Sequence, residues 1–309
     1  MYLKRKTKKI KPVPVSICVP AYNEGKNIGR LLKSLVHQKT RHVQIHRIIV
    51  ISSGSTDKTE SIVKTMSKDH PTIELIHESH RTGKAAAINL FLNTATDPIL
   101  VIQSADTIAR PRTIEKLCLP MIQDKTIGMT GGAPIPLNDP NTFLGYVIHA
   151  WWWFHRNIPR FGEIVAFRNI LKKISAKTAV DEAYIQAKII KRRYKVVHVD
   201  DAIVHNKGAE TVRDVIKQRR RIFNGHSRLY MEEGVKIDNM TKSSLRLLLF
   251  HYKLHSLKEL VWLMSGILIE FYARSLGMYD YYVAKINPTI WNVAKTTKDL
   301  SIQAEEALS

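Results

Sequence analysis

A lone carboxylate at the end of an apolar run is the first feature of this sequence that could carry chemistry. Residues 99–102 are apolar, and after one glutamine the stretch Ser104-Ala105-Asp106 follows. Aspartate is common where a strand ends, because its side chain can hydrogen bond to its own backbone in a turn. Its carboxylate is also an oxygen ligand that a hard divalent cation accepts. This stretch alone supports a turn residue and a site residue about equally.

Two adjacent acids offer a second kind of chemistry. Asp181 and Glu182 open a predicted helix over 180–193. A carboxylate there could take the proton of an attacking hydroxyl, which is general-base catalysis. The structural alternative is that the acids only stabilise the helix dipole, by about 0.3–1 kcal/mol. Helical neighbours diverge by about 100°, so we expect one acid to be the base and the other a cap or the ligand of a basic partner.

The pattern of the first hundred residues predicts how these side chains are positioned. Strand-like runs alternate with helical patterns, and the strands are expected at 13–19, 45–52, 72–78 and 98–103. Such alternation indicates crossover units and an α/β fold with a mostly parallel central sheet flanked by helices. Ligands of such sheets bind beyond the carboxyl ends of the strands. Asp106 lies just past the fourth strand, which favours the site interpretation.

The following region is less regular. Residues 128–140 are rich in glycine and proline, which predicts a loop that crosses the sheet. Helical patterns cover 143–156, with three consecutive tryptophans, and the basic stretch 211–230. Adjacent tryptophans cannot share one side of a helix, so most of that aromatic surface is expected to pack against other elements.

Six short motifs lie at or near the predicted element ends. They are Val-Pro-Ala-Tyr-Asn-Glu at 19–24, Ile-Ser-Ser-Gly-Ser-Thr-Asp at 51–57, Arg-Thr-Gly-Lys at 81–84, Ser-Ala-Asp at 104–106, Val-Asp-Glu at 180–182 and Gln-Arg-Arg-Arg-Ile at 218–222. In this order they resemble the family 2 glycosyltransferases, over roughly residues 13–230. The resemblance implies a GT-A fold with a Rossmann-like nucleotide-binding half. It also implies an inverting, metal-dependent transfer of sugar from a nucleoside-diphosphate sugar to an acceptor hydroxyl, on a glycan or a lipid-linked molecule.

The resemblance implies roles for individual residues. The segment with Tyr22 and Glu24 would hold the base and ribose, and Lys84 with Arg81 would lie near the base and phosphates. Asp106 would carry a divalent metal, Mg²⁺ or Mn²⁺, on the diphosphate. The full set matched to donor binding is Pro20, Ala21, Tyr22, Glu24, Ser53, Arg81, Lys84, Asp106, Gln218, Arg220 and Arg221.

The later motifs complete the implied site. Gln218, Arg220 and Arg221 match a family segment near the diphosphate and the acceptor, and Asp181 and Glu182 match the acidic pair that contains the catalytic base. The family's spacing to the following strand favours Glu182 as the base, whereas the family's usual aspartate favours Asp181. We lean to Glu182 and keep both candidates.

This sequence departs from the family pattern in ways that limit what the resemblance implies. Ser52-Ser53 stand where the family usually has two aspartates, one of which often reads uracil, so a UDP donor is not implied. Ser104 replaces the first acid of Asp-x-Asp, which weakens metal affinity or makes it depend on the donor. Ile222 replaces a tryptophan that stacks on the acceptor sugar in polymerising members, so we expect a non-processive enzyme. His205 is a further metal ligand or, as the better interpretation, a surface or packing residue.

Charge and hydropathy suggest partners. The net charge of +21 attracts polyanions such as nucleic acid, an anionic membrane surface or phosphorylated small molecules. Residues 243–283 are strongly apolar, and their longest uncharged run, 260–269, is shorter than the roughly 20 residues of a membrane span. We expect a helix in the membrane interface, on the cytoplasmic face. A helical pair that caps a soluble domain is the alternative.

The expected organisation is a basic tail at 1–12, a GT-A domain at 13–235 and a C-terminal helical segment at 236–309. One alternative function is that of a sugar-phosphate nucleotidyltransferase, which shares the fold class. Such an enzyme needs a Gly-rich basic loop after the first strand, and residues 20–27 match that pattern poorly. A basic nucleic-acid-binding protein would explain the charge but not the acids at strand ends. We therefore expect no nucleic-acid partner.

Overall fold

The structure is a computed structural model that describes residues 11–157, 161–235, 237 and 253–287. Nearly all of the predicted basic tail and the first part of the predicted apolar segment, residues 243–252, lie outside the described residues.

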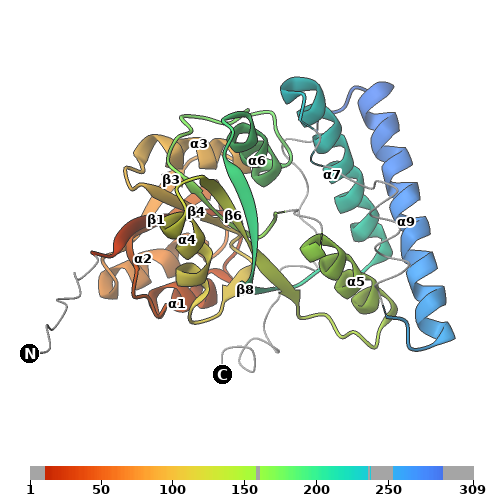
Figure 1. The fold of residues 1–309 in the computed structure, drawn as a ribbon, viewed down its shortest axis with the longest axis horizontal. Coiled ribbons are helices and arrows are strands. Elements are labelled where there is room, and N and C mark those ends of the chain that lie inside the picture. Colours follow the sequence, from red (N-terminus) through yellow and green to blue (C-terminus); the bar gives the residue numbers. More distant parts are fainter. Residues whose placement is uncertain (1–10, 158–160, 236, 238–252, 288–309) are drawn as a thin grey trace, which may run out of the picture.

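An eight-stranded mixed sheet forms the centre of the protein, in the order β3-β2-β1-β4-β7-β6-β8-β5 (Figure 1). The strands are β1 (Val13–Ala21), β2 (Val43–Ser53), β3 (Ile73–Glu78), β4 (Ile99–Gln103), β5 (Thr107–Ala109), β6 (Ile127–Pro136), β7 (Ile164–Arg168) and β8 (Lys195–Asn206). Strands β1 to β4 pair in parallel, which confirms the predicted crossover units. Strand β7 runs antiparallel to both of its neighbours, β4 and β6.

The helices are α1 (Ile28–Val36), α2 (Thr59–Asp69), α3 (Lys84–Thr94), α4 (Thr113–Gln123), α5 (Phe143–Asn157), α6 (Asp181–Lys191), α7 (Val212–Glu233) and α9 (Leu257–Tyr282). Helices α1, α2 and α4 cover one face of the sheet, and α3 and α6 cover the other. Successive side chains of a strand point to opposite faces. Ile17 of β1 accordingly joins the core with α1 and α4, whereas Cys18 joins the core with α3 and α6.

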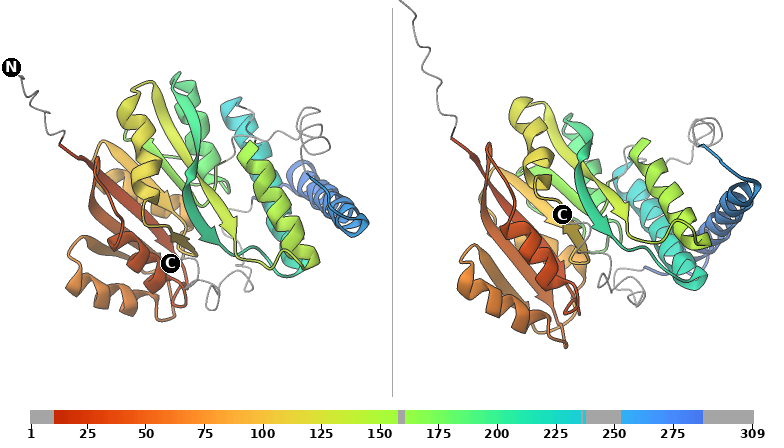
Figure 2. Two further views of the ribbon diagram at one scale, coloured as in Figure 1. Left: turned by 60° about the horizontal axis from the view of Figure 1, so that its bottom comes forward. Right: turned by 90° about the horizontal axis from the view of Figure 1, so that it is seen from below.

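Helices α5, α7 and α9 form a separate layer beside the sheet (Figure 2). Helices α7 and α9 lie side by side, and α5 packs against α9. Helix α7 begins where the Thr211 hydroxyl accepts a hydrogen bond from the backbone N–H of Asp214 at 3.2 Å, and it ends at Gly234, whose φ of 66° is left-handed. The predicted basic helix is therefore confirmed.

The prediction of a loop over residues 128–140 is wrong for most of its length, because residues 127–136 form the buried strand β6. Its glycines are there because neighbours leave no room for a side chain. A Cβ on Gly131 would lie 2.1 Å from the Phe161 ring. A Cβ on Gly132 would lie 2.6 Å from the carbonyl oxygen of Ala202 in β8. Glycine here marks close approach rather than a turn.

Gly132→Ala is expected to destabilise the protein by about 1–3 kcal/mol, because a backbone carbonyl cannot move aside without disturbing the sheet. Gly29→Ala in α1 is the matched control, since its Cβ would make an ordinary 3.5 Å contact with Ile62. Urea denaturation of both variants measures the difference. Equal midpoints for Gly132→Ala and wild type would contradict this account of β6.

Candidate active site

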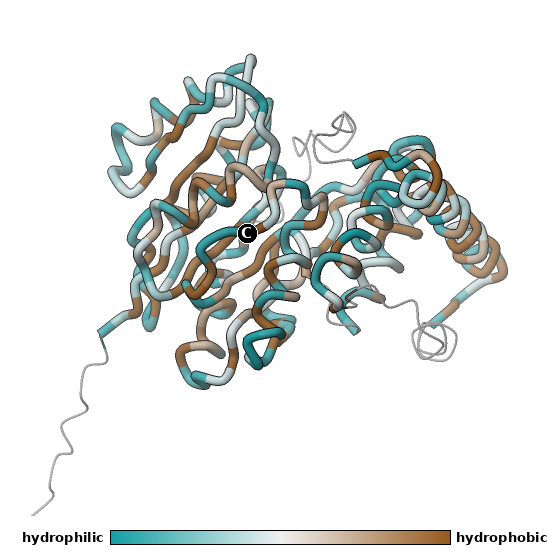
Figure 3. Tube along the Cα trace, turned by 90° about the horizontal axis from the view of Figure 1, so that it is seen from above, coloured by the Kyte–Doolittle hydropathy of each residue, from teal (hydrophilic) through white to brown (hydrophobic). Residues whose placement is uncertain are grey.

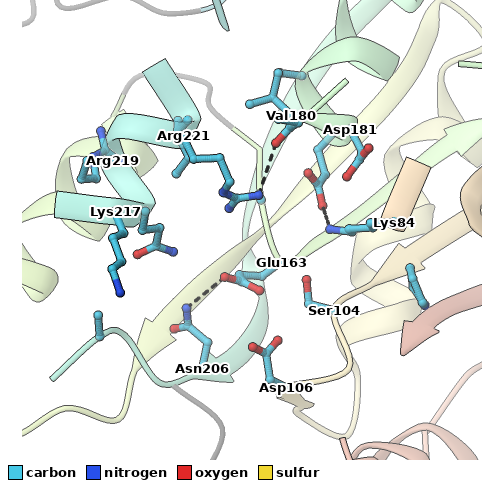
Figure 4. A pocket seen from close by; sticks show the side chains of 18 of the residues that line it. Lys84, Ser104, Asp106, Glu163, Val180, Asp181, Asn206, Lys217, Arg219 and Arg221 are labelled. Atoms are coloured by element: carbon cyan, nitrogen blue, oxygen red, sulfur yellow. Dashed lines mark hydrogen bonds and ion pairs between the residues drawn. The ribbon is translucent and has the colours of Figure 1, made fainter. Parts of the chain in front are cut away.

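A cavity of about 840 Å³ opens between the carboxyl ends of the parallel strands and the layer formed by α5, α7 and α9 (Figure 4). All residues that the sequence matched to the donor or to the catalytic base line this cavity. They are Pro20, Ala21, Tyr22, Glu24, Ser53, Arg81, Lys84, Asp106, Asp181, Glu182, Gln218, Arg220 and Arg221. The fold thus brings together side chains that lie up to 200 residues apart in sequence.

Asp106 occupies the turn between β4 and β5. Its carboxylate makes no hydrogen bond or ion pair with any residue in the described part of the chain. The turn is instead held by Thr107, whose hydroxyl donates to the carbonyl oxygen of Ser104 at 2.8 Å. The geometry therefore does not support a turn-forming role for Asp106, and it leaves the carboxylate available in the cavity.

The acids at the start of α6 share the cavity with one lysine. The Nζ atom of Lys84, the first residue of α3, lies 2.5 Å from Oε1 of Glu182. Burial favours the neutral form of Glu182, but the charge and hydrogen bond of Lys84 outweigh it and hold the Glu182 pKa below its ordinary value. The same ion pair, against the cost of burial, raises the pKa of Lys84.

Asp181 is in a different state from its neighbour. Its side chain is almost completely buried, and its Oδ1 atom has no hydrogen-bond partner among the described residues. Burial, opposed by Lys84 and helped by Glu182, raises the Asp181 pKa to about 7. Arg221 of α7 is the second cation near these acids, and its guanidinium donates to the carbonyl oxygen of Ala179 at 3.4 Å.

Glu163 is a further carboxylate that lines the cavity, and the sequence analysis missed it. It directly precedes β7 in left-handed backbone, with a φ of 62°, which costs a non-glycine residue on the order of 1 kcal/mol. Asn206 donates to its Oε1 at 3.3 Å. Burial, and then the nearby charge of Asp106, raise the Glu163 pKa to about 7. Because β7 is antiparallel to β4, its start lies at the carboxyl end of β4. The sequence gives no local signal that β7 runs in this direction, so it could not place Glu163 in the cavity.

The segment matched to the nucleotide base is held by local contacts. The Arg81 guanidinium lies over the Tyr22 ring, 4.0 Å from its centroid. Ser53 accepts a hydrogen bond from the backbone N–H of Thr82 at 2.9 Å and thus ties the end of β2 to the loop before α3. Glu24 is buried and accepts from the Asn27 side chain at 3.2 Å.

The three consecutive arginines of α7 point to different partners. Arg219 forms a two-pronged ion pair with Glu270 of α9, with distances of 2.6 and 2.8 Å. Arg220 pairs in the same way with Asp280 of α9. Arg221 is the one whose charge is felt by the acids of α6. Arg220 lines the cavity but is already bound to α9.

The geometry favours the packing interpretation of His205. Its Nε2 atom accepts a hydrogen bond from Nε of Arg110 at 3.2 Å, and its ring does not line the cavity. Ile222, at the position of the family's stacking tryptophan, packs at the edge of the core beside α6.

The oxygen atoms of the cavity fit a hard divalent cation that also binds a donor. Asp106 and Glu163 are carboxylates, and Asn206 has a buried amide oxygen without a hydrogen-bond partner in the described structure. No cluster of three or more His, Cys, Asp or Glu ligands occurs among the described residues. Mg²⁺ commonly uses one or two carboxylates and completes its shell with phosphate oxygens and water. Such a cation would depend on the donor diphosphate.

Comparison with known proteins identifies the class. Residues 16–171, half of the chain, match the family described as Glycosyl transferase family 2. The chain therefore belongs to this family, and the class of enzyme is a glycosyltransferase. The resemblance seen in the sequence motifs is confirmed.

One solved structure has the same fold, and two curated relatives match part of the sequence. The mannosyltransferase PcManGT of Pyrobaculum calidifontis, solved with GDP-Man and Mn²⁺, superposes with a TM-score of 0.57 at 22% identity, over 90% of this chain and 82% of that one. An uncharacterized glycosyltransferase of Haemophilus influenzae is 33% identical over 103 residues. A dolichyl-phosphate β-glucosyltransferase, ALG5A of Trichomonas vaginalis, is 36% identical over 81 residues. These matches span 33% and 25% of this chain, and 31% and 25% of the two curated relatives.

Asp181→Asn is expected to stabilise the protein at neutral pH. Burial raises the Asp181 pKa from its ordinary value of 3.8 to about 7 in the folded chain, so the wild type loses stability as the pH rises through this interval. The variant has no charge to bury, and its advantage in melting temperature should grow from pH 4 to pH 7.

Glu182→Gln provides the opposite control. The Glu182 pKa is lowered, so its pairing stabilises the fold at neutral pH and is lost on acidification. This variant should melt below wild type at pH 7, with a difference that shrinks as the pH falls below the ordinary Glu pKa of 4.5. If Asp181→Asn melts like wild type at every pH, burial does not raise the pKa of Asp181 in the folded protein.

Proposed function

We propose that this protein is an inverting, metal-dependent and non-processive glycosyltransferase that moves a sugar from a nucleoside-diphosphate sugar to an acceptor hydroxyl. The observation that carries the proposal is the arrangement of the cavity. Asp106 has no partner among the described residues, and the buried acids at the start of α6 line the same cavity with Lys84 and Arg221. In this proposal Asp106 serves the diphosphate of the donor, and the acids at the start of α6 serve the acceptor hydroxyl.

The reaction in this proposal is one displacement. The acceptor oxygen forms a bond to the anomeric carbon while the bond from that carbon to the diphosphate oxygen breaks. The electron pair leaves with the nucleoside diphosphate, and the acceptor proton passes to a carboxylate. Asp106 would hold a Mg²⁺ or Mn²⁺ ion, which would supply positive charge to the diphosphate. Lys84 and Arg221 supply further positive charge to the leaving group.

Glu182 is the better candidate for the base. It stays ionised at neutral pH, whereas Asp181 carries a proton for part of the time because its pKa is about 7. Lys84 pairs with Glu182 and lines the same cavity as Asp106. A bound diphosphate would compete for the Lys84 ammonium, and the Glu182 carboxylate would then become more basic when the donor is present.

Glu182→Gln is expected to lower the turnover of sugar transfer by about 10²–10⁴-fold, because the acceptor proton has no base, while donor binding persists. Turnover is measured with the donor found by a hydrolysis screen over UDP-, GDP- and dTDP-sugars. Asp181→Asn is the matched control and should retain more activity. Wild-type rates in both amide variants would place the base elsewhere.

Two observations bear on which nucleotide the donor carries. Ser53 replaces the acid that often reads uracil, and its hydroxyl is engaged by Thr82. The neighbour from Pyrobaculum calidifontis binds GDP-Man. GDP is therefore included beside UDP in a thermal-shift panel, with and without Mn²⁺. A transferase of this kind should respond to a diphosphate nucleotide only with the metal present.

An apolar helix supports a membrane-bound site of action, which we also propose. Among the described residues, α9 alone is long and apolar enough, by length and composition, to cross a bilayer. Figure 3 shows this helix at the outer edge of the protein. From position 260 to 282 no exposed side chain of α9 is charged. The exposed apolar and aromatic residues there are Leu260, Val261, Met264, Leu268, Phe271, Tyr272, Met278, Tyr279 and Tyr282.

Its other face argues for a helix that lies in the interface rather than one that spans. That face carries Glu270 and Asp280, which are paired with Arg219 and Arg220 of α7. A spanning orientation would draw these paired charges into hydrocarbon, where charges are costly. An interfacial orientation buries the apolar face and leaves the pairs in protein.

The acceptor and the location follow from this surface as part of the proposal. A lipid-linked acceptor would reach the cavity from the membrane, and one curated relative is named for a dolichyl-phosphate acceptor. Nucleotide sugars and anionic lipids occur together at the cytoplasmic face, where a protein of net charge +21 is attracted. A glycan acceptor at that surface is the alternative.

Leu268→Asp is expected to weaken binding to anionic vesicles by tenfold or more, since burying one leucine contributes about 1.5–3 kcal/mol. Met231→Asp at the end of α7 is the control, because the two side chains are 66% and 68% exposed and both changes add one negative charge. Flotation with neutral and anionic vesicles in low salt measures binding. Wild-type protein that floats with neither kind of vesicle would leave only a soluble helical layer.

A further inference from the structure

The cation site has a gap in its sequence motif that the fold could fill from another strand. Ser104 stands where the first acid of the family's Asp-x-Asp is expected, so the chain between β4 and β5 offers only Asp106. The cavity wall beside this turn is formed by the start of β7 and the end of β8 (Figure 4).

Glu163 is the carboxylate that β7 brings there. Its backbone carbonyl accepts the N–H of Ser104 at 2.8 Å, so the two residues lie side by side at the same sheet edge. Its carboxylate lies close enough to Ser104 and Asp106 for both to influence its pKa. Neither Glu163 nor Asp106 forms an ion pair within 4.0 Å in the described residues, although Lys84 and Arg221 lie farther off in the same cavity.

Asn206 is an independent observation that points to a ligand. It is the last residue of β8, it is 95% buried, and it lines the same cavity. Its amide nitrogen donates to Glu163, while its amide oxygen has no partner among the described residues. Buried polar atoms are normally paired, and a neutral amide oxygen is a ligand that hard cations accept.

We propose that Glu163 supplies the second carboxylate of the divalent cation site, in the place that Ser104 leaves without an acid, and that the Asn206 amide oxygen faces the same ion. The inference rests on the proposed function, because the remaining ligands are the donor diphosphate and water. Two carboxylates, one amide oxygen and phosphate oxygens form a hard, all-oxygen set of the kind that Mg²⁺ and Mn²⁺ prefer.

The alternative is that Glu163 only joins β7 to β8. A structural carboxylate of that kind needs neither the neighbouring acid nor the left-handed backbone that aims it at the cavity. Two neighbouring carboxylates without a close cation repel each other, and a bound divalent cation would offset this repulsion.

The test measures Mn²⁺ binding rather than activity. Electron paramagnetic resonance reports free Mn²⁺ in titrations of the full-length protein with saturating GDP or UDP. Glu163→Gln keeps the shape and can still accept the hydrogen bond from Asn206, but it removes the charge. It should weaken Mn²⁺ binding by about 10–100-fold, while the melting temperature without metal does not fall below that of wild type. Asp106→Asn is the reference for loss of a ligand.

A rescue variant separates a ligand from a structural residue. Ser104→Asp combined with Glu163→Gln returns a carboxylate to the same cavity wall from β4, and it should restore most of the lost Mn²⁺ affinity. Glu60→Gln, a carboxylate bound to Ser52 and outside the cavity, is the matched control and should bind Mn²⁺ as wild type does.

The outcomes distinguish this inference from the function on which it rests. Wild-type protein that binds Mn²⁺ with neither nucleotide would overturn both. Wild-type affinity in Glu163→Gln, with a clear loss in Asp106→Asn, would overturn the role of Glu163 and leave the proposed function standing. A loss in Glu163→Gln that Ser104→Asp fails to repair would also overturn the inference, because the site would then need Glu163 for its structure and not for its charge.

Discussion

The charge balance of one cavity governs the rest of this structure. Asp106, Glu163, Asp181 and Glu182 are four of the carboxylates that line it, and the charges of Lys84 and Arg221 act on the two acids of α6. Burying like charges together is costly unless they are paired or partly neutral. The protein resolves this unevenly: Glu182 is paired with Lys84, the pKa values of Asp181 and Glu163 rise, and Asp106 is left without a partner among the described residues. A donor with its cation would complete the balance.

The fold brings these charged side chains together because the helices that carry them begin at the cavity. Lys84 is the first residue of α3 and Asp181 the first of α6, so both helices begin at the cavity. A helix N-terminus favours negative charge. The two helix starts therefore support the anions of the site, and the Lys84–Glu182 pair links the two elements that carry them.

The parts that the sequence predicted well are those with local signals. Alternating strands and helices indicated the parallel half of the sheet, and ordered motifs indicated the cavity residues from Pro20 to Arg221. Strand β6 was missed because its glycines resemble a loop, although they report the closeness of Phe161 and Ala202. Glu163 was missed because its place depends on β7 running antiparallel, which is a matter of long-range pairing. No local pattern carries that information.

The ion pairs between α7 and α9 have a consequence for dissecting this chain. Glu270 and its partner Arg219 are both largely buried, and Arg274 also contacts Glu270. Removing one partner of a buried pair is typically destabilising by about 3–5 kcal/mol, because the other charge is left buried alone. A shortened chain that ends near residue 235 would expose the aliphatic and basic face of α7 beside the cavity. Helix α9 thus supports α7, which lines the cavity. Deleting α9 to make the protein more soluble would remove that support.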